Sequence, residues 1–137
     1  MTRHAPQPAP TSAGDVGRRI VITLRLPPRE LSPNGRPGWA PKARAVRRYR
    51  ETAHLLALAA RPGRPMERAR VTAKFYFVDR RQRDPDNLLA SLKSAIDGLV
   101  DAHVVGNDAN MVHMPIEQYV DRANPRVEIE VQEVTDP

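Results

Sequence analysis

The spacing of apolar residues along this chain alternates between the two-residue period of β-strands and the longer period of amphipathic helices. The segments with these patterns are, in order, 19–26 (strand), 42–60 (helix), 67–78 (strand), about 86–100 (helix), 111–120 (strand) and 126–134 (strand). This β-α-β-α-β-β order predicts a single α+β domain in which a mixed β-sheet packs against two helices. Each strand–helix–strand step can place its strands in parallel, whereas the last two strands are expected to form a hairpin across the turn sequence DRANP.

The length of the chain limits it to one core. With 137 residues, 40% of them hydrophobic, it can bury one core but not two ordinary ones. Residues 1–17 are rich in Pro, Ala, Ser, Thr and Gly and are predicted to form a disordered tail, so the folded domain is expected to span 18–137.

Several protein classes are excluded by composition. No apolar run approaches the roughly 20 residues of a membrane-spanning helix, and the N-terminus lacks the apolar stretch of a secretory signal. The chain has no cysteine, which excludes disulfides, thiol catalysis and cysteine-bound metal clusters and makes the cytoplasm the expected compartment. Nucleotide-binding and serine-hydrolase motifs are absent, so no nucleotide cofactor and no membrane partner are expected.

Charge is distributed unevenly along the chain. Residues 1–83 hold 19 Lys and Arg against 5 Asp and Glu, a net +14, whereas residues 84–137 hold 3 against 11, a net −8. The basic half predicts a surface for a polyanion such as DNA, and the acidic half predicts a cluster that can hold cations. A solvated surface with compositional drift accounts for the same numbers and stays open as an alternative.

The apolar positions predict which faces are buried. The expected buried residues are Val46, Tyr49, Ala53, Leu56 and Ala60 in the first helix, Leu88, Leu89, Leu92, Ala95, Ile96, Leu99 and Val100 in the second, and Val71, Ala73, Phe75 and Phe77 in the strand between them. This strand and the second helix are expected to build the core and a dimer interface.

Two carboxylates, Asp84 and Asp86, stand two residues apart where the second helix begins. Capping of the helix N-terminus, with Pro85 in the first turn, explains one acid but does not require a second. If Asp108 joined them, three carboxylates together with water and phosphate oxygens would suit Mg²⁺, which activates water for phosphodiester hydrolysis. Spacing alone does not show whether Asp108 returns along a helix of roughly 22 Å to meet Asp84.

The sequence RDPDNLLASLKSAIDGLVDAHVVGND, residues 83–108, resembles the central motif of the RusA family of Holliday junction resolvases. That motif has an R-D-x-D-N run, an amphipathic helix ending near D-G-L-V-D-A, and a later acidic turn. The upstream SPNGRPGWAPKARAVRRYR is similar to the family's N-terminal loop and basic helix, so the likeness covers about 19–134. It implies a homodimeric, Mg²⁺-dependent endonuclease of DNA recombination and repair that resolves four-way junctions by paired symmetric nicks.

The resemblance also implies roles for individual residues. By position in the motif, Asp84 and Asp86 match the first two catalytic, metal-binding carboxylates, and Asp108 matches the third. Arg83 matches the basic residue that precedes the first Asp and is expected to contribute positive charge near the scissile phosphate.

The chain departs from the family pattern at two positions. The family commonly has a lysine four residues after the second Asp, where this chain has Ala90. Lys93, nearly one turn further along the helix, is the candidate that could bring an ammonium group to a similar place. The first acid of the family's D-D pair is Asn107 here, which weakens any expectation of a fourth metal ligand.

DNA contacts are expected from a set of basic residues, namely Lys42, Arg44, Arg47, Arg48, Arg80, Arg81 and Arg83. Those in the helix could equally form a solvated face, and those beside the acids could also neutralise the local aspartates. His103 is either a proton shuttle or a structural or surface histidine. Trp39 and Tyr76 either stack on exposed bases or anchor a core or interface.

Two other functions stay open on the residues alone. One is a non-catalytic basic DNA-binding or architectural protein in which the acids are only caps and solubilising charge. The other is a metal-dependent nuclease with a different structural preference, such as flaps or ordinary duplex.

Overall fold

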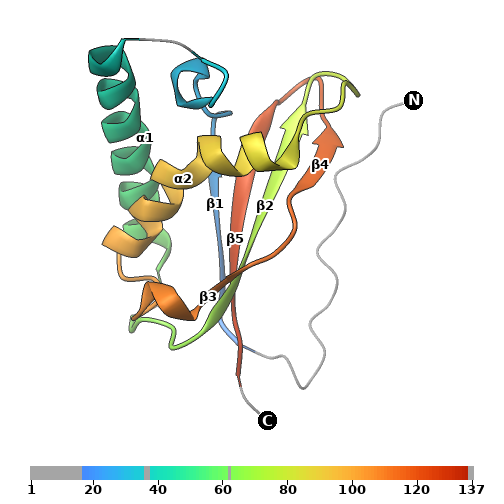
Figure 1. Ribbon diagram of the computed structural model, residues 1–137. Helices are drawn as coiled ribbons and strands as arrows, with labels where there is room; N and C mark the ends of the chain where they lie inside the picture. The colour runs from blue at the N-terminus through green and yellow to red at the C-terminus, as the bar shows by residue number, and fades with distance from the viewer. Residues whose placement is uncertain (1–16, 36–37, 62, 136–137) are drawn as a thin grey trace.

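The computed structural model describes residues 17–35, 38–61 and 63–135 (Figure 1). Its elements are β1 (Arg19–Leu24), the 3₁₀ turn η2 (Arg29–Leu31), α1 (Trp39–Ala60), β2 (Ala69–Phe77), α2 (Pro85–Asp101), the 3₁₀ turn η3 (Asp108–Asn110), β3 (Met111–His113), β4 (Glu117–Val120) and β5 (Arg126–Glu133). The predicted α+β domain with a mixed sheet and two helices is confirmed. The predicted disordered tail lies outside the described residues except for its last position. In the described ranges, no helix has the length and apolar character needed to cross a bilayer.

Strand β2 is paired along both of its edges. On one edge it pairs antiparallel with β5, which in turn pairs antiparallel with β1, so β1 and β2 run in parallel as expected. On the other edge it pairs in parallel with β3 near its start and with β4 near its end. The strand–helix–strand steps therefore produce the parallel relationships that the sequence predicted.

The predicted hairpin between the last two strands is wrong. β4 and β5 lie on opposite edges of β2, because Tyr76 pairs with Tyr119 on one side and with Arg126 on the other. The connecting turn therefore passes the end of β2 instead of joining two neighbours. β5 takes the central position, which lets it bury Val127 and Ile129 completely. The segment predicted as one strand at 111–120 is two, β3 and β4, separated by a non-strand stretch.

Both helices cover one face of the sheet, and the core lies between the helices and the sheet (Figure 1). The strand residues buried there include Ile20, Ile22 and Leu24 of β1, all four predicted residues of β2, and Val127, Ile129 and Val131 of β5. The opposite face carries ion pairs, including Arg19 and Lys74 with Glu130 at 2.7 and 3.4 Å. Tyr76 is also on that face but is only 2% exposed, because it stacks on Tyr119 and lies under the guanidinium of Arg126. Tyr76 is therefore a packing residue and is not available to stack on a DNA base.

The buried stripe of α1 is narrower than predicted. It consists of Ala45, Tyr49, Ala53 and Ala57, spaced four residues apart. Tyr49 and Ala53 were expected there, whereas Leu56 is 38% exposed and Ala60 is exposed. The physical reason is the close approach of α2, which small residues permit and leucines would prevent. In α2, the prediction is wrong for Leu89, which is 42% exposed.

Gly98 marks the closest approach of the two helices. A Cβ atom at this position would lie 2.4 Å from the backbone oxygen of Arg50 and 2.9 Å from the Cβ of Ala53. Beside this contact, the Arg50 guanidinium donates two hydrogen bonds, of 2.7 and 2.8 Å, to the carboxylate of Asp101. These bonds lower the pKa of Asp101 below its usual value, and burial opposes them. The crossing of α1 and α2 is therefore fixed by a steric contact and an adjacent ion pair.

We expect Gly98→Ala to destabilise the fold by about 1–3 kcal/mol, the usual cost of overpacking a tight contact. The loss should appear despite the higher helix propensity of alanine. Urea unfolding followed by circular dichroism measures it. Gly63→Ala is the control, because a Cβ there meets no atom within 4 Å. Equal stability of the two variants would show that the helices separate at no cost.

Candidate active site

Asp84 begins α2 and is held in place by its capping hydrogen bond. Its Oδ1 accepts a bond of 2.9 Å from the backbone N–H of Asp86, and its backbone oxygen accepts the first helical bond from Leu88. Pro85 follows at the first helical position, where its missing N–H costs nothing. The capping role of Asp84 is thus confirmed, and it uses only one of the two carboxylate oxygens.

Asp86 has no such structural task. Its side chain is exposed and forms no hydrogen bond or ion pair with the residues that the structure describes. It lies in the first turn of α2, where the positive end of the helix dipole favours a carboxylate. Two acidic groups, one partly engaged and one unengaged, therefore share this helix start.

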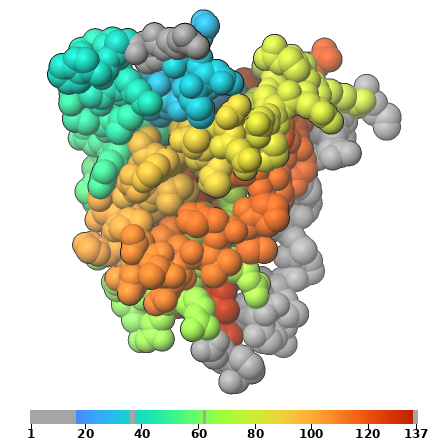
Figure 2. Space-filling view, in the orientation of Figure 1, coloured from blue at the N-terminus to red at the C-terminus, as the bar shows by residue number. Residues whose placement is uncertain are grey.

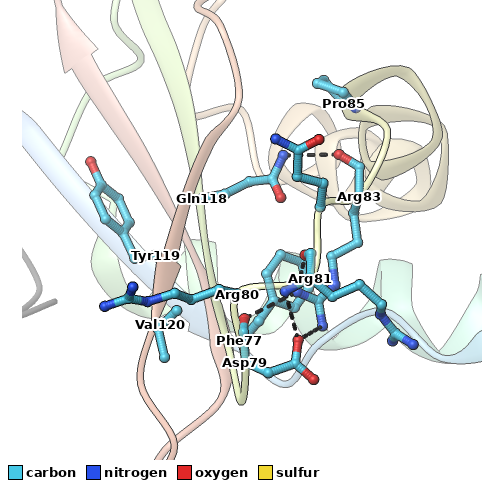
Figure 3. Close-up of a pocket in the computed structure, with 10 residues that line it drawn as sticks. Phe77, Asp79, Arg80, Arg81, Arg83, Pro85, Gln118, Tyr119 and Val120 are labelled. Carbon is cyan, nitrogen blue, oxygen red and sulfur yellow. Dashed lines mark hydrogen bonds and ion pairs between the residues drawn. The ribbon is translucent and has the colours of Figure 1, made fainter. Parts of the chain in front are cut away.

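Arg83, directly before Asp84, points back into its own loop (Figure 3). Its guanidinium carbon lies 3.8 Å above the centre of the Phe77 ring, and one of its nitrogens is 3.0 Å from Oδ1 of Asp79. The nearby arginine therefore neutralises Asp79 and not Asp84 or Asp86. The pKa of Asp79 is lowered, mainly by the hydrogen bond that its carboxylate accepts from the backbone N–H of Arg81. The positive charge of Arg83 lowers this pKa further.

A hollow of about 650 Å³ opens beside this loop. The residues that line it are Phe77, Asp79, Arg80, Arg81, Gln82, Arg83 and Pro85, together with Gln118, Tyr119 and Val120 of β4 (Figure 3). Gln118 donates a hydrogen bond of 3.0 Å to the backbone oxygen of Arg83, which ties β4 to the loop. The hollow is thus an arginine-bearing recess adjacent to the start of α2.

Asp108 lies at the other end of α2. It belongs to η3, which leads into β3, and Met111 of β3 pairs with Ala69 at the start of β2. Asp84 follows the end of β2, so the two acids are separated by the 17 residues of α2, or roughly 25 Å of helix. In the described part of the chain, no three His, Asp or Glu side chains come close enough to hold a metal ion. One chain therefore places Asp84 and Asp86 two residues apart at the start of α2 and places Asp108 beyond its other end.

The other candidates on α2 lie away from the two acids. Lys93 is on the same side of α2 as Asp86, two turns further on, and its side chain is 78% exposed and 3.5 Å from the carboxylate of Asp97. Ala90 is exposed between them. His103 lies just beyond the C-terminal end of α2, with a positive φ of 56°, at the end of the helix far from Asp84.

The predicted DNA-binding residues gather toward one end of the molecule. Lys42, Arg44, Arg47 and Arg48 are exposed in the first half of α1, and this half lies at the same end as the loop after β2 (Figure 1). Arg80 and Arg81 are exposed along the hollow. Trp39, at the start of α1, is 84% exposed and is no core anchor.

Sequence reasoning missed Asp79 and Gln118. Asp79 had a usable signal, since it lies four residues before Arg83 in the loop where the sequence already predicted site residues. Gln118 had none, because a glutamine in a strand does not reveal which loop it faces.

The capping function and the charge of Asp84 can be separated. We expect Asp84→Ala to lower the free energy of unfolding by about 1 kcal/mol, whereas Asp84→Asn should change it by only a few tenths because asparagine also caps well. Chemical denaturation of both variants tests this. Equal losses in the two would mean that the capping bond does not stabilise α2.

Comparison with known proteins identifies the family of the chain. The model of a family described as Endodeoxyribonuclease RusA matches residues 29–132, which includes both helices, strands β2, β3 and β4, and all of β5 except its last residue. An uncharacterized protein of Xylella fastidiosa (strain Temecula1) is 33% identical over 127 residues, covering 90% of this chain and 82% of that protein. The chain belongs to the RusA endodeoxyribonuclease family.

Proposed function

We propose that this chain is a Mg²⁺-dependent endodeoxyribonuclease that resolves four-way DNA junctions by paired, symmetric hydrolysis of phosphodiester bonds. The observation that carries the proposal is the pair Asp84 and Asp86 at the start of α2, within the motif of the RusA family. Since the substrate is junction DNA in recombination and repair, the cytoplasm is its proposed place of action.

The donor set at the start of α2 fits a hard cation. Asp84 keeps one carboxylate oxygen outside its capping bond, and the carboxylate of Asp86 is unengaged among the described residues. Mg²⁺ accepts one or two carboxylates and keeps several waters, so an exposed pair suffices to begin its shell. When bound, the ion would polarise the scissile phosphate and activate a water molecule. The capping bond would hold Asp84 in a fixed orientation, while Arg81 at the neighbouring hollow would attract the DNA backbone.

The separation of Asp108 from the other acids supports a homodimer. If the third ligand comes from Asp108, a second copy must supply it, since one chain keeps the acids at opposite ends of α2. A two-fold axis across the middle of α2 would place the Asp108 of each copy beside the Asp84 and Asp86 of the other. Two related sites then result, as paired cuts require.

The face between the two ends of α2 has the character of such an interface. Figure 2 shows α2 and the segment that follows η3 side by side on this face. Two large apolar side chains are exposed on these elements: Leu89 at 42% and Met114 at 38%. Burial of exposed apolar residues of this kind is what drives two copies to associate.

The remaining predicted residues have supporting roles in the proposal. The exposed cations of α1 (Lys42, Arg44, Arg47 and Arg48) would contact the phosphates of a DNA arm, and Arg80 would act beside Arg81. Lys93 would lend positive charge at the same face of α2 as Asp86, two turns away.

We expect the protein to make paired nicks in a labelled synthetic four-way junction with Mg²⁺ and none with EDTA. Asp86→Asn should slow nicking by about 10²–10³-fold or more, the cost of losing a group on which transition-state charge stabilisation depends. A denaturing gel measures nicking, and a gel shift should show junction binding unchanged.

The control variant is Glu51→Gln, which removes one exposed negative charge from α1 and should nick normally. Junction binding without nicks under any divalent metal would contradict the enzyme and favour a binding protein. Equal cutting of linear duplex would favour a nuclease of another structural preference.

The shared site can be tested with mixed dimers. We expect a heterodimer of Asp86→Asn with Asp108→Asn, purified through two different tags, to nick at about half the wild-type rate, because one of its two composite sites is intact. Each homodimer of these variants should be inactive. The reciprocal control pairs a wild-type chain with a chain carrying both substitutions, and this dimer should be inactive. The opposite pattern would mean that each chain builds its own site.

A further inference from the structure

Arg83 is bound by its own loop on several sides. One terminal nitrogen donates to the backbone oxygens of Asp79, at 3.2 Å, and of Arg81, at 2.6 Å. The other terminal nitrogen lies 3.0 Å from Oδ1 of Asp79, and the plane of the group lies over Phe77. The side chain is only 18% exposed. Since a guanidinium has five N–H donors, most of its capacity is already used within the protein.

These contacts connect the end of the sheet to the start of α2. Phe77 is the last residue of β2, and Asp79 opens the loop, where its Oδ1 also accepts a bond of 3.0 Å from the backbone N–H of Arg81. From the other side, Gln118 of β4 holds the backbone oxygen of Arg83. The residue directly before Asp84 is thus fixed by its side chain and by its carbonyl group.

Arg81 offers the contrast. It is exposed at the rim of the same hollow, and its guanidinium forms no hydrogen bond or ion pair with the residues that the structure describes. It can reach a phosphate without breaking any contact, whereas Arg83 would first have to leave Phe77 and Asp79. The two arginines of this loop are therefore not equivalent.

We propose that Arg83 is a positioning residue and not a phosphate ligand: with Asp79, Phe77 and Gln118 it braces the loop so that Asp84 and Asp86 are held at the start of α2. This inference rests on the proposed function for its consequence, since the braced acids are the proposed metal ligands. It is an alternative to the expectation that Arg83 supplies positive charge directly to the scissile phosphate. The brace itself concerns the folded loop and exists whether or not the protein cleaves DNA.

The first test uses hydrogen exchange of the free protein, with Arg83→Gln, Asp79→Asn and Arg81→Gln compared by mass spectrometry. Loss of the brace should speed exchange of the amides of 79–88 by about tenfold in the first two variants, because local opening becomes easier. Arg81→Gln should exchange as the wild type does. Far-UV circular dichroism confirms that each variant is folded. Unchanged exchange in Arg83→Gln and Asp79→Asn would overturn the inference, and this readout requires no activity.

The second test separates bracing from phosphate binding. In gel shifts with a four-way junction at several salt concentrations, Arg81→Gln should reduce the slope of log affinity against log salt by about one, whereas Arg83→Gln should leave the slope unchanged. A reduced slope in Arg83→Gln would overturn the inference.

The third test concerns the metal. Titration of Mg²⁺ in the nicking reaction should give a half-saturating concentration several-fold higher for both Arg83→Gln and Asp79→Asn, and the double variant should be no worse than Arg83→Gln alone, since the two residues act as one unit. If Arg83 instead served the phosphate directly, Asp79→Asn would leave the Mg²⁺ requirement unchanged. If the wild type does not nick, the proposed function fails, and the exchange experiment still decides the brace.

Discussion

The pairing of β2 on both of its edges determines where everything else in this domain lies. Because β5 occupies one edge and β3 and β4 the other, β2 runs between the two ends of the molecule at which the acid groups lie. The ring of its last residue, Phe77, packs against the guanidinium of Arg83, and Gln118 of its partner strand β4 donates a hydrogen bond to the backbone oxygen of Arg83. Its first residue, Ala69, pairs with Met111, which anchors the turn that carries Asp108. One strand thus sets the position of both ends of the proposed site.

Helix α2 determines how far the acid pair lies from Asp108. It starts at the acid pair and returns along the sheet toward the beginning of β2, so its length fixes the distance to Asp108. The helix cannot tilt freely to shorten this distance, because Gly98 contacts the backbone of α1 and Arg50 holds Asp101 beside it. A rigid helix with acids at both ends suits a symmetric pair of sites better than a single internal one.

The features of the fold and of the site that the sequence predicts correctly are those that depend on residues close together in the chain. The element order and a carboxylate cap at the start of the second helix follow from short-range patterns. The order is confirmed except that 111–120 forms two strands, and Asp84, one of the two acids that could cap the helix, is the N-cap. The hairpin prediction failed because strands that are adjacent in the sequence need not be neighbours in the sheet, and β5 pairs with β1 and β2 instead of β4. The buried stripe of α1 shifted away from Leu56 because the helix spacing depends on Gly98 of another element. The partner chosen by Arg83 was equally invisible, since Asp79, Asp84 and Asp86 are all within reach in sequence.

That choice of partner has an electrostatic consequence for the site. If Arg83 paired with Asp84 or Asp86, the loop would neutralise its own acids, and the acidic pair would be explained as local charge balance. Instead, the guanidinium of Arg83 binds the carboxylate of Asp79 and the backbone oxygens of Asp79 and Arg81, all of which precede the helix. Within the described ranges, the two carboxylates at the helix start have no cationic partner. Mg²⁺ is commonly bound through one or two carboxylates and keeps several waters. The loop therefore places arginines near the acids while leaving the acids free for a cation.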